Sequence, residues 1–138
     1  MPIMTIHLKK DSYSDAQCEA LMLDVAQRYA EILECPIDRT RILIDEIPGQ
    51  RMMVGGRLQT ASDSHGAPFF EFFMLAGRPR EQHERMHAET TAALVKHLGV
   101  DARLIRGCCY ELPPTHWSIG GELASVKRAA EVVARASS

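Results

Sequence analysis

Apolar residues follow two different spacings in the first half of the chain. Residues 3–8 form a short β-prone run, and the apolar residues within 18–33 recur at the spacing of one helix face. A capping-box pattern at Ser14 predicts where this helix begins, and Pro36 prevents it from continuing. Residues 41–47 contain a continuous apolar core, which is typical of a buried strand. The pattern therefore predicts a strand, a helix and a second strand.

The second half of the chain shows the same order of patterns. Residues 69–75 predict a strand, and Pro79 is expected at the first position of a helix. That helix should end near Leu98, with Gly99 as its stop signal, and residues 104–112 predict the next strand. Because a helix joins the two strands of each unit, we expect the strands to be parallel with a right-handed crossover.

Direct comparison of the two halves indicates an internal duplication. Residues 41–56 align with 106–121 at a constant offset of 65 without gaps, and they share an Arg, a Glu, a Pro and a Gly-Gly pair. We expect an α/β (α+β) fold in which tandem βαβ units form one four-stranded sheet backed by two helices. Within one compact domain, the expected parts are 1–60 as the first unit, 61–67 as a linker, 68–121 as the second unit and 122–138 as a C-terminal helix.

Composition restricts the classes of function. The 138 residues are 46% hydrophobic and 25% charged, which is typical of a globular protein. With 16 basic and 18 acidic residues the net charge is −2, which argues against nucleic-acid and acidic-membrane partners. No apolar run approaches the roughly 18 residues of a membrane span, and the start has no signal-peptide layout. The four cysteines have no CxxC spacing, so we expect reduced thiols in a cytoplasmic protein.

Two motifs carry a resemblance to a known family. The start MPIMTIHL and the segment THWSIGGELAS are similar to 4-oxalocrotonate tautomerase. The chain resembles a fused, two-unit member of the tautomerase superfamily over roughly residues 2–125. This resemblance implies an isomerase that acts on small carboxylates as a homotrimer, with no cofactor and no metal.

Pro2 is the residue with the most distinctive chemistry. If Met1 is removed, Pro2 presents a secondary amine, and burial beside cations would lower the pKa of that amine. Such an amine can act as a general base near neutral pH. A chain that keeps Met1 has an amide there, and Pro2 would then only begin an edge strand.

The resemblance also assigns substrate-binding residues. The spacing from Pro68 to Arg78 repeats the family's spacing from its proline to the arginine that holds a substrate carboxylate. A planar guanidinium suits that role because two of its N–H groups can meet two carboxylate oxygens. Arg41 matches the second family arginine and Arg106 is its repeat-related copy, so the sequence leaves open which of them faces a site. Trp117 occupies the family's aromatic position, where an apolar wall keeps the amine desolvated.

The two units differ at these positions. Where the second unit has Arg78 and Trp117, the first has Ser12 or Tyr13 and Met52. We therefore expect one working site that combines Pro2 with Arg78 and Trp117. The mirror-image site around Pro68, whose nitrogen is an amide, should be inactive.

Two other reactions of the superfamily remain as alternatives. Malonate semialdehyde decarboxylase has an aspartate after the first helix and an arginine pair, which Asp38 and the Arg78–Arg80 run match. Asp38 could equally serve the turn before a strand. Hydratases and dehalogenases need a water-activating glutamate where this chain has Ile119, and one type uses a histidine where it has Tyr29. The tautomerase interpretation is preferred.

Two further interpretations belong to other classes of function. Residues 83–87 read H-E-x-x-H, the pattern of a zinc-protease helix. The further zinc-ligand pattern of such proteases, HxxGxxH, does not follow this segment. A chance match on a solvated helix face, without a metal site, is therefore the preferred interpretation. A trimeric scaffold without activity is the other alternative, and it predicts an N-terminus without a group that titrates near neutral pH.

Overall fold

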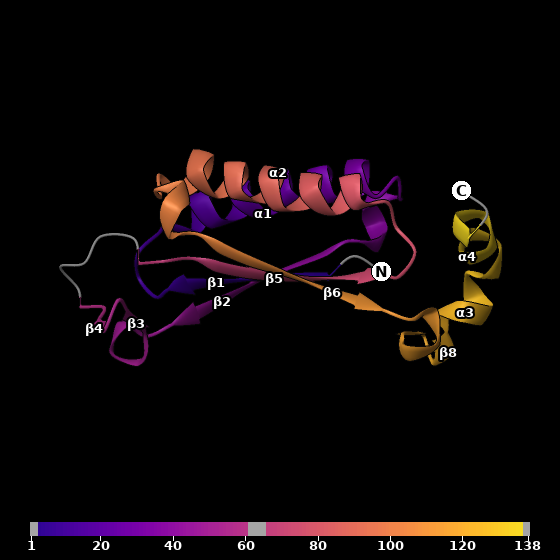
Figure 1. Ribbon diagram of the computed structural model, residues 1–138. Coiled ribbons are helices and arrows are strands. Elements are labelled where there is room, and N and C mark those ends of the chain that lie inside the picture. The colour runs from indigo at the N-terminus through magenta and orange to yellow at the C-terminus, as the bar shows by residue number, and fades with distance from the viewer. Residues whose placement is uncertain (1–2, 61–65, 137–138) are drawn as a thin grey trace.

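Two helices lie side by side across one face of a four-stranded sheet in the computed structural model, which describes residues 3–60 and 66–136 (Figure 1). The strands of this sheet are β1 (Ile3–Lys9), β2 (Arg41–Ile47), β5 (Phe69–Leu75) and β6 (Arg106–Leu112). The two long helices are α1 (Asp15–Ile32) and α2 (Arg80–Leu98). The shorter elements are η1 (Ile37–Arg39), η2 (Gly49–Arg51), β3 (Met53–Val54), β4 (Arg57–Leu58), η3 (Ala102–Leu104), η4 (Pro114–His116), β7 (Ser118–Ile119), β8 (Glu122–Leu123), α3 (Ala124–Lys127) and α4 (Ala129–Ala136).

The order of strands in the sheet is β2-β1-β5-β6. Each unit pairs its own strands in parallel, and the units meet where β1 and β5 pair antiparallel at the centre. Ile3 therefore lies between Arg41 on β2 and Phe73 on β5, while Arg106 lies beside Phe69 at the opposite end of the sheet. The predicted pair of βαβ units in one four-stranded sheet is confirmed.

The core lies between the sheet and the two helices. β1 and β5 have the same alternation of buried and half-buried positions, as expected for repeat-related strands with one covered face. The largest fully buried side chains of these strands and helices are Met4, Ile6, Leu8, Leu21, Val25, Tyr29, Ile32, Phe70, Phe72, Met74, Met86 and Leu94. On β5, the rings of Phe70 and Phe72 occupy the buried positions that Met4 and Ile6 occupy on β1.

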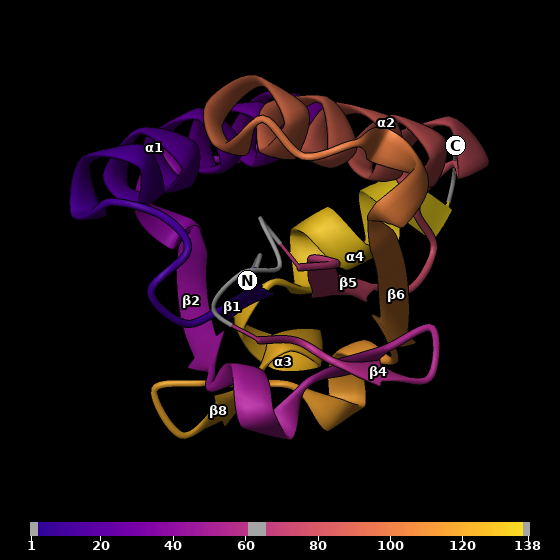
Figure 2. The same ribbon diagram turned by 90° about the vertical axis from the view of Figure 1, so that its left-hand side faces the viewer.

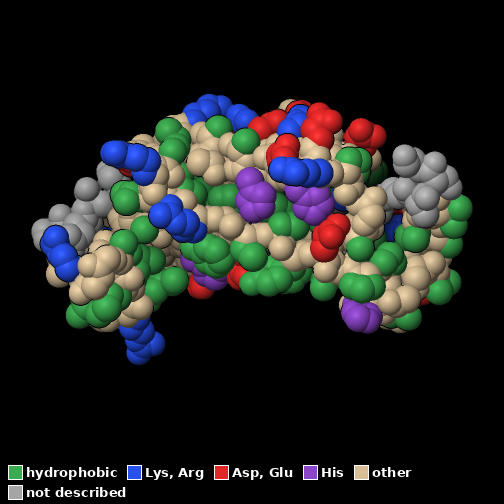
Figure 3. All heavy atoms as spheres, viewed as in Figure 1, with side chains coloured by type: hydrophobic (Ala, Val, Ile, Leu, Met, Phe, Trp, Pro, Cys, Tyr) green, Lys and Arg blue, Asp and Glu red, His purple; other side chains and the backbone are tan. Residues whose placement is uncertain are grey.

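The face of the sheet turned away from the helices carries a mixed surface. Leu43 and Tyr110 are exposed there. His7 lies at its centre, with its two ring nitrogens 3.0 Å from Asp45 and 3.1 Å from Glu71. Figure 3 shows apolar side chains gathered along this lower side of the sheet. In a single chain, this face is largely uncovered.

Helix boundaries follow the predicted signals with one correction. The Ser14 hydroxyl accepts a hydrogen bond from the Gln17 amide at 3.2 Å, and the Gln17 side chain accepts one from the Ser14 amide at 3.1 Å. Gly99 ends α2 in the left-handed conformation, with φ of 67°. Pro79, however, is not the first helical residue: its ψ of 145° is extended, so it caps α2 from outside and the helix begins at Arg80.

The predicted C-terminal helix from residue 122 was wrong in its extent. Gly120 and Gly121 both have positive φ and form a turn that pairs β8 with β7, so residues 122–123 are a strand. Arg128 then has φ of −123°, which interrupts the helical segment between α3 and α4. Figure 2 shows these two helices as separate elements.

The short hairpins lie at opposite ends of the sheet (Figure 1). β3 and β4 follow β2, whereas β7 and β8 follow β6 and lead into α3 and α4. Residues 61–65 of the predicted linker lie outside the described residues. Among the helices that the structure describes, none is long and apolar enough to cross a membrane.

Candidate functional site

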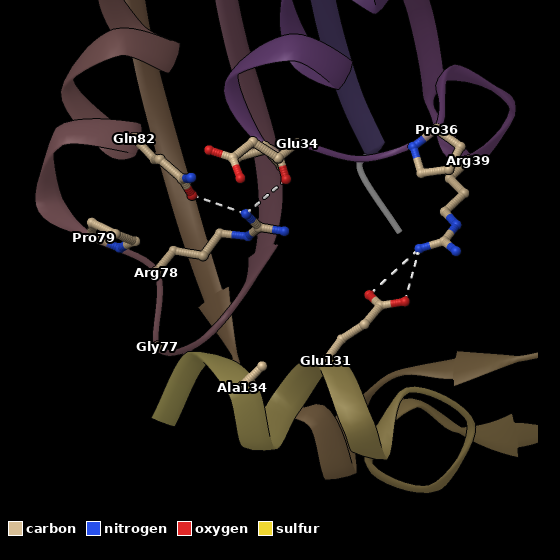
Figure 4. Close-up of a pocket in the computed structure, with 10 residues that line it drawn as sticks. Glu34, Pro36, Arg39, Gly77, Arg78, Pro79, Gln82, Glu131 and Ala134 are labelled. Carbon is tan, nitrogen blue, oxygen red and sulfur yellow. Dashed lines mark hydrogen bonds and ion pairs between the residues drawn. The ribbon is translucent and has the colours of Figure 1, made fainter. Parts of the chain in front are cut away.

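A pocket of about 820 Å³ opens at the end of the sheet where β1 begins. Its walls come from the end of α1, the η1 turn, the connection from β5 to α2 and the C-terminal helix α4 (Figure 4). The described lining residues are Leu33, Glu34, Pro36, Arg39, Gly77, Arg78, Pro79, Gln82, Glu131 and Ala134. Both units and the C-terminal segment therefore contribute to one cavity.

Arg78 forms one wall of the pocket. It follows Gly77, whose φ of 89° lies in the region that glycine adopts without steric cost and which turns the chain from β5 toward α2. The guanidinium donates to the Leu33 carbonyl at 3.1 Å and to the Gln82 side-chain oxygen at 2.9 Å. Both of these acceptors are uncharged, so neither bond neutralises the arginine.

A second arginine, Arg39, lines the opposite wall. It belongs to the η1 turn, and its guanidinium lies 3.1 Å and 3.4 Å from the two carboxylate oxygens of Glu131 on α4. Arg128 approaches the same carboxylate at 3.4 Å. Neither Arg39 nor Glu131 was predicted from the sequence, because neither lies at a position that the family resemblance assigned.

Arg41 and Arg106, which the sequence could not distinguish, lie at opposite ends of the sheet. Arg41 begins β2 beside Ile3, and its guanidinium donates to the carbonyls of Asp38 and Thr40 at 3.1 Å and 2.9 Å. Arg106 begins β6 at the far end and makes the equivalent bonds to backbone carbonyls of its own unit. Within one chain, Arg41 rather than Arg106 lies at the same end of the sheet as the pocket.

Trp117 lies at the same end as Arg78. Its ring centroid is 6.1 Å from that of Phe73, which in turn stacks on Tyr110 at 5.2 Å. The backbone carbonyl of Trp117 accepts from the Ala124 amide at 2.8 Å, which ties the hairpin to α3. Met52, at the repeat-related position, lies instead near Lys9 and Gly66 at the other end.

The residues of the decarboxylase pattern are not brought together. Asp38 is exposed in η1, and Arg80 is 90% exposed and pairs with Glu84 at 2.7 Å. Neither Asp38 nor Arg80 is among the described residues that line the pocket. Tyr29, which replaces the dehalogenase histidine, is fully buried and donates to the Phe73 carbonyl at 2.8 Å.

Pro2 lies outside the described residues. The first described residue of the strand, Ile3, lies beside Arg41 and Phe73, at the end of the sheet that carries the pocket. Cys35 lies near this end of the sheet, and the pKa of its thiol responds to the charges around it. Burial raises the pKa of its thiol, while the positive charges of Arg78 and Arg39 act in the opposite direction.

The H-E-x-x-H segment makes contacts unlike those of a metal site. His83 lies 3.6 Å from the Cys109 sulfur and 3.4 Å from Glu111, whereas His87 packs against the rings of Phe70 and Phe72. Burial, followed by Glu111, raises the pKa of the Cys109 thiol to about 11. Across residues 3–60 and 66–136, no group of three or more His, Cys, Asp or Glu side chains is placed to hold a metal ion.

The chain is similar to known proteins both in sequence and in fold. The model of the tautomerase enzyme family matches residues 68–127. A 2-hydroxymuconate tautomerase of Comamonas testosteroni is 33% identical over 54 residues, which cover 39% of this chain and 86% of the relative. A 2-hydroxymuconate tautomerase of Pseudomonas putida is 34% identical over 56 residues, covering 41% of this chain and 87% of the relative.

Solved structures resemble the whole chain rather than one unit. The structure of native fused 4-OT matches with a TM-score of 0.82 at 23% identity, and the match covers 94% of this chain and 98% of that chain. A macrophage migration inhibitory factor from Toxoplasma gondii matches with a TM-score of 0.72 at 21% identity, covering 88% and 98%. The sequence relatives and the duplicated fold lead to the same conclusion: the chain belongs to the tautomerase family, as a fused two-unit isomerase of the 4-oxalocrotonate tautomerase type.

Proposed function

We propose that this protein catalyses keto–enol tautomerisation of 2-hydroxydienoate or enolpyruvate-type carboxylates, with the amine of Pro2 as the base. The observation that carries the proposal is the position of Arg78. This arginine lines a pocket at the end of the sheet where β1 begins, so a carboxylate held there would lie near the start of the chain. The similarity to 2-hydroxymuconate tautomerases supports this class of substrate.

In the proposed reaction, Arg78 binds the substrate carboxylate through two N–H donors. The amine accepts the proton of the enol hydroxyl, and the resulting ammonium returns one proton to a carbon of the conjugated chain. The carbonyl forms as the double bonds shift, so no atom is gained or lost. The amine must be uncharged to begin the reaction, and positive charge close to it would disfavour its protonated form.

Trp117 and Arg41 complete the proposed site. The Trp117 ring would form an apolar wall that limits water around the amine. Arg41 would interact with the oxygen atoms at the reacting end of the substrate. Its guanidinium donates to the backbone carbonyls of Asp38 and Thr40, and Arg41 pairs with Ile3, so this arginine lies at the end of the sheet that the role requires.

We further propose that three copies of the chain assemble with their sheets inside and their helices outside. The uncovered sheet face supports this arrangement, because it exposes Leu43 and Tyr110. A wild-type fused 4-OT of similar fold is an asymmetric trimer. Each trimer would then hold three working sites around Pro2 and three inactive ones around Pro68.

The proposal is tested by N-terminal mass spectrometry followed by enzyme assays. The mature chain should lack Met1 and should tautomerise 2-hydroxymuconate or phenylenolpyruvate. Pro2→Ala should lower kcat/KM at least about 100-fold, because it replaces the secondary amine that acts as general base. Pro68→Ala is the matched control and should leave the activity within about twofold, since the nitrogen at Pro68 is an amide.

Three outcomes would contradict the proposal: a retained Met1 in an active enzyme, unchanged activity of Pro2→Ala, or no activity toward either substrate. Rapid release of carbon dioxide from malonate semialdehyde, abolished by Asp38→Asn, would instead support the decarboxylase alternative.

A further inference from the structure

Gln82 occupies the same place in α2 that Gln17 occupies in α1. Each is the third residue of its helix, and the two are related by the repeat offset of 65. The Gln17 side-chain oxygen accepts a hydrogen bond from the Ser14 amide at 3.1 Å. Its side-chain nitrogen donates to the His97 carbonyl near the end of α2, also at 3.1 Å. Gln17 therefore caps its own helix and ties that helix to its neighbour.

Gln82 cannot make the equivalent cap, because the residue that matches Ser14 is Pro79, whose nitrogen has no hydrogen to donate. The Gln82 side-chain oxygen instead accepts from the Arg78 guanidinium at 2.9 Å (Figure 4). The same guanidinium nitrogen donates to the Leu33 carbonyl at the end of α1 at 3.1 Å. At this end of the sheet an arginine thus lies between the glutamine and the neighbouring helix, whereas at the other end the glutamine makes that link directly.

The orientation of the Arg78 guanidinium matters because its planar fork meets two carboxylate oxygens in one geometry only. Gly77 brings the backbone of Arg78 to the pocket, and the acceptors on α1 and α2 then hold the guanidinium from two sides. Arg78 and Gln82 both line the pocket. The bond between them is therefore made within the site that would receive the substrate.

We propose that Gln82 is a positioning residue, which holds the Arg78 guanidinium in the direction that binds the substrate carboxylate. Pro79 makes Gln82 available for this role, because it removes the amide hydrogen that would otherwise draw the glutamine into a helix cap. The inference rests on the proposed function, in which Arg78 binds that carboxylate.

Gln82→Met tests the role, because it keeps the length of the side chain and removes the acceptor oxygen. trans,trans-Muconate is a diene dicarboxylate without an enol, so isothermal titration calorimetry with it measures binding without the reaction. Its Kd should rise about fivefold to tenfold in the variant, the scale of one hydrogen bond to a charged group. With the enol substrates, KM should rise by a similar factor while kcat changes by less than about twofold, since Gln82 acts through Arg78 and not on the reacting atoms.

Gln17→Met is the matched control from the other unit. It removes the cap at Ser14 and the link to His97, so it should lower the midpoint of urea unfolding. It should leave the Kd for muconate within about twofold of the native value, because Gln17 lies outside the described pocket lining. Gln82→Met should show the reverse pattern, with weaker binding and a smaller change in the unfolding midpoint.

Pro79→Ser tests how Gln82 becomes available. The serine restores an amide hydrogen and would draw Gln82 back to the start of α2, so the Kd for muconate should rise. The double variant Pro79→Ser/Gln82→Met should bind no more weakly than Gln82→Met alone, because both changes remove the same bond. Additive losses would instead show that the proline acts on the backbone of Arg78, and would overturn its assigned role.

Unchanged muconate binding in Gln82→Met would overturn the inference, and so would an equal loss of binding in Gln17→Met. Tighter binding in Gln82→Met would overturn it too, since Gln82 would then compete with the ligand for Arg78. The proposed reaction fails separately, through inactivity toward the enol substrates while muconate binding still depends on Gln82.

Discussion

The backbone direction at Arg78 depends on one residue. Gly77 has φ of 89°, so the chain can reverse after β5 and bring Arg78 over the end of α1. There the Leu33 carbonyl accepts a hydrogen bond from the guanidinium. A side chain at position 77 would strain that conformation. In the first unit, Ser12 and Tyr13 occupy the corresponding segment, and Tyr13 packs against the core instead.

Arg78→Ala should raise KM for a carboxylate substrate strongly, with a smaller effect on kcat. The lost bidentate contact corresponds to ~1.5–3 kcal/mol, or about tenfold to a hundredfold in kcat/KM. Tyr13→Phe, the matched change in the other unit, should alter neither parameter by more than about twofold. Steady-state kinetics of both variants checks this, and equal losses would contradict the assignment of the working site to the Arg78 end.

Residue-level chemistry was predictable from the sequence only at positions that match the motifs of the family. Arg78, Arg41 and Trp117 were found this way, and the structure places all three at one end of the sheet. Arg39 and Glu131 were not predicted, because an ion pair across 92 positions leaves no local pattern.

At the scale of elements, α1 and α2 are joined by a charged network centred on Asp24. Its carboxylate accepts from Arg28 within α1 and from His97 at 2.8 Å and Lys96 at 3.1 Å on α2. The hydrogen bond from Arg28, supported by those from His97 and Lys96, lowers the pKa of Asp24 well below its usual value, against the effect of burial. The network therefore favours the ionised carboxylate in the folded protein.

This network predicts a specific dependence of stability on pH. Because the folded-state pKa of Asp24 is depressed, its contribution is fully present above the unfolded value of about 3.9 and is lost as the pH falls toward the folded value. Asp24→Asn should lower the free energy of unfolding at pH 7 by ~1–3 kcal/mol, with less effect near pH 3. Urea unfolding at both pH values measures this.

A suitable control for Asp24→Asn is Glu84→Gln, which removes an exposed ion pair within α2 and should change stability much less. A difference between the native protein and Asp24→Asn that stays constant from pH 7 to pH 3 would contradict the assignment.

The sequence predicted most elements because capping and periodicity are local. The Ser14 box and Gly99 act within a few residues of the helix ends that they define. The continuous C-terminal helix was wrong because the paired glycines of the hairpin and the break at Arg128 outweigh the helical composition of that segment. The contact between Gly107 and the Phe70 ring also escaped prediction, because it depends on register across two strands.

For the whole molecule, the uncovered sheet face indicates association, and the proposed assembly predicts a trimer in solution. Sedimentation velocity should give a species of about three times the 15.4 kDa chain. Leu43→Glu should dissociate it, because Leu43 is 54% exposed on the sheet face and would place a charge in each buried interface. Leu23→Glu, at a 64% exposed position on α1, should leave the trimer intact. A stable native monomer, or dissociation by both variants, would contradict this arrangement.

The antiparallel pairing of β1 with β5 has a consequence for how the protein can evolve. Phe70 packs over Gly107 in one unit, while Met4 and Ile42 face each other at the matching position of the other. If the same sheet were built from two identical chains, every substitution would occur at both ends of the sheet. Here each codon affects one end only, so natural selection can preserve one end while the other drifts or acquires a different use.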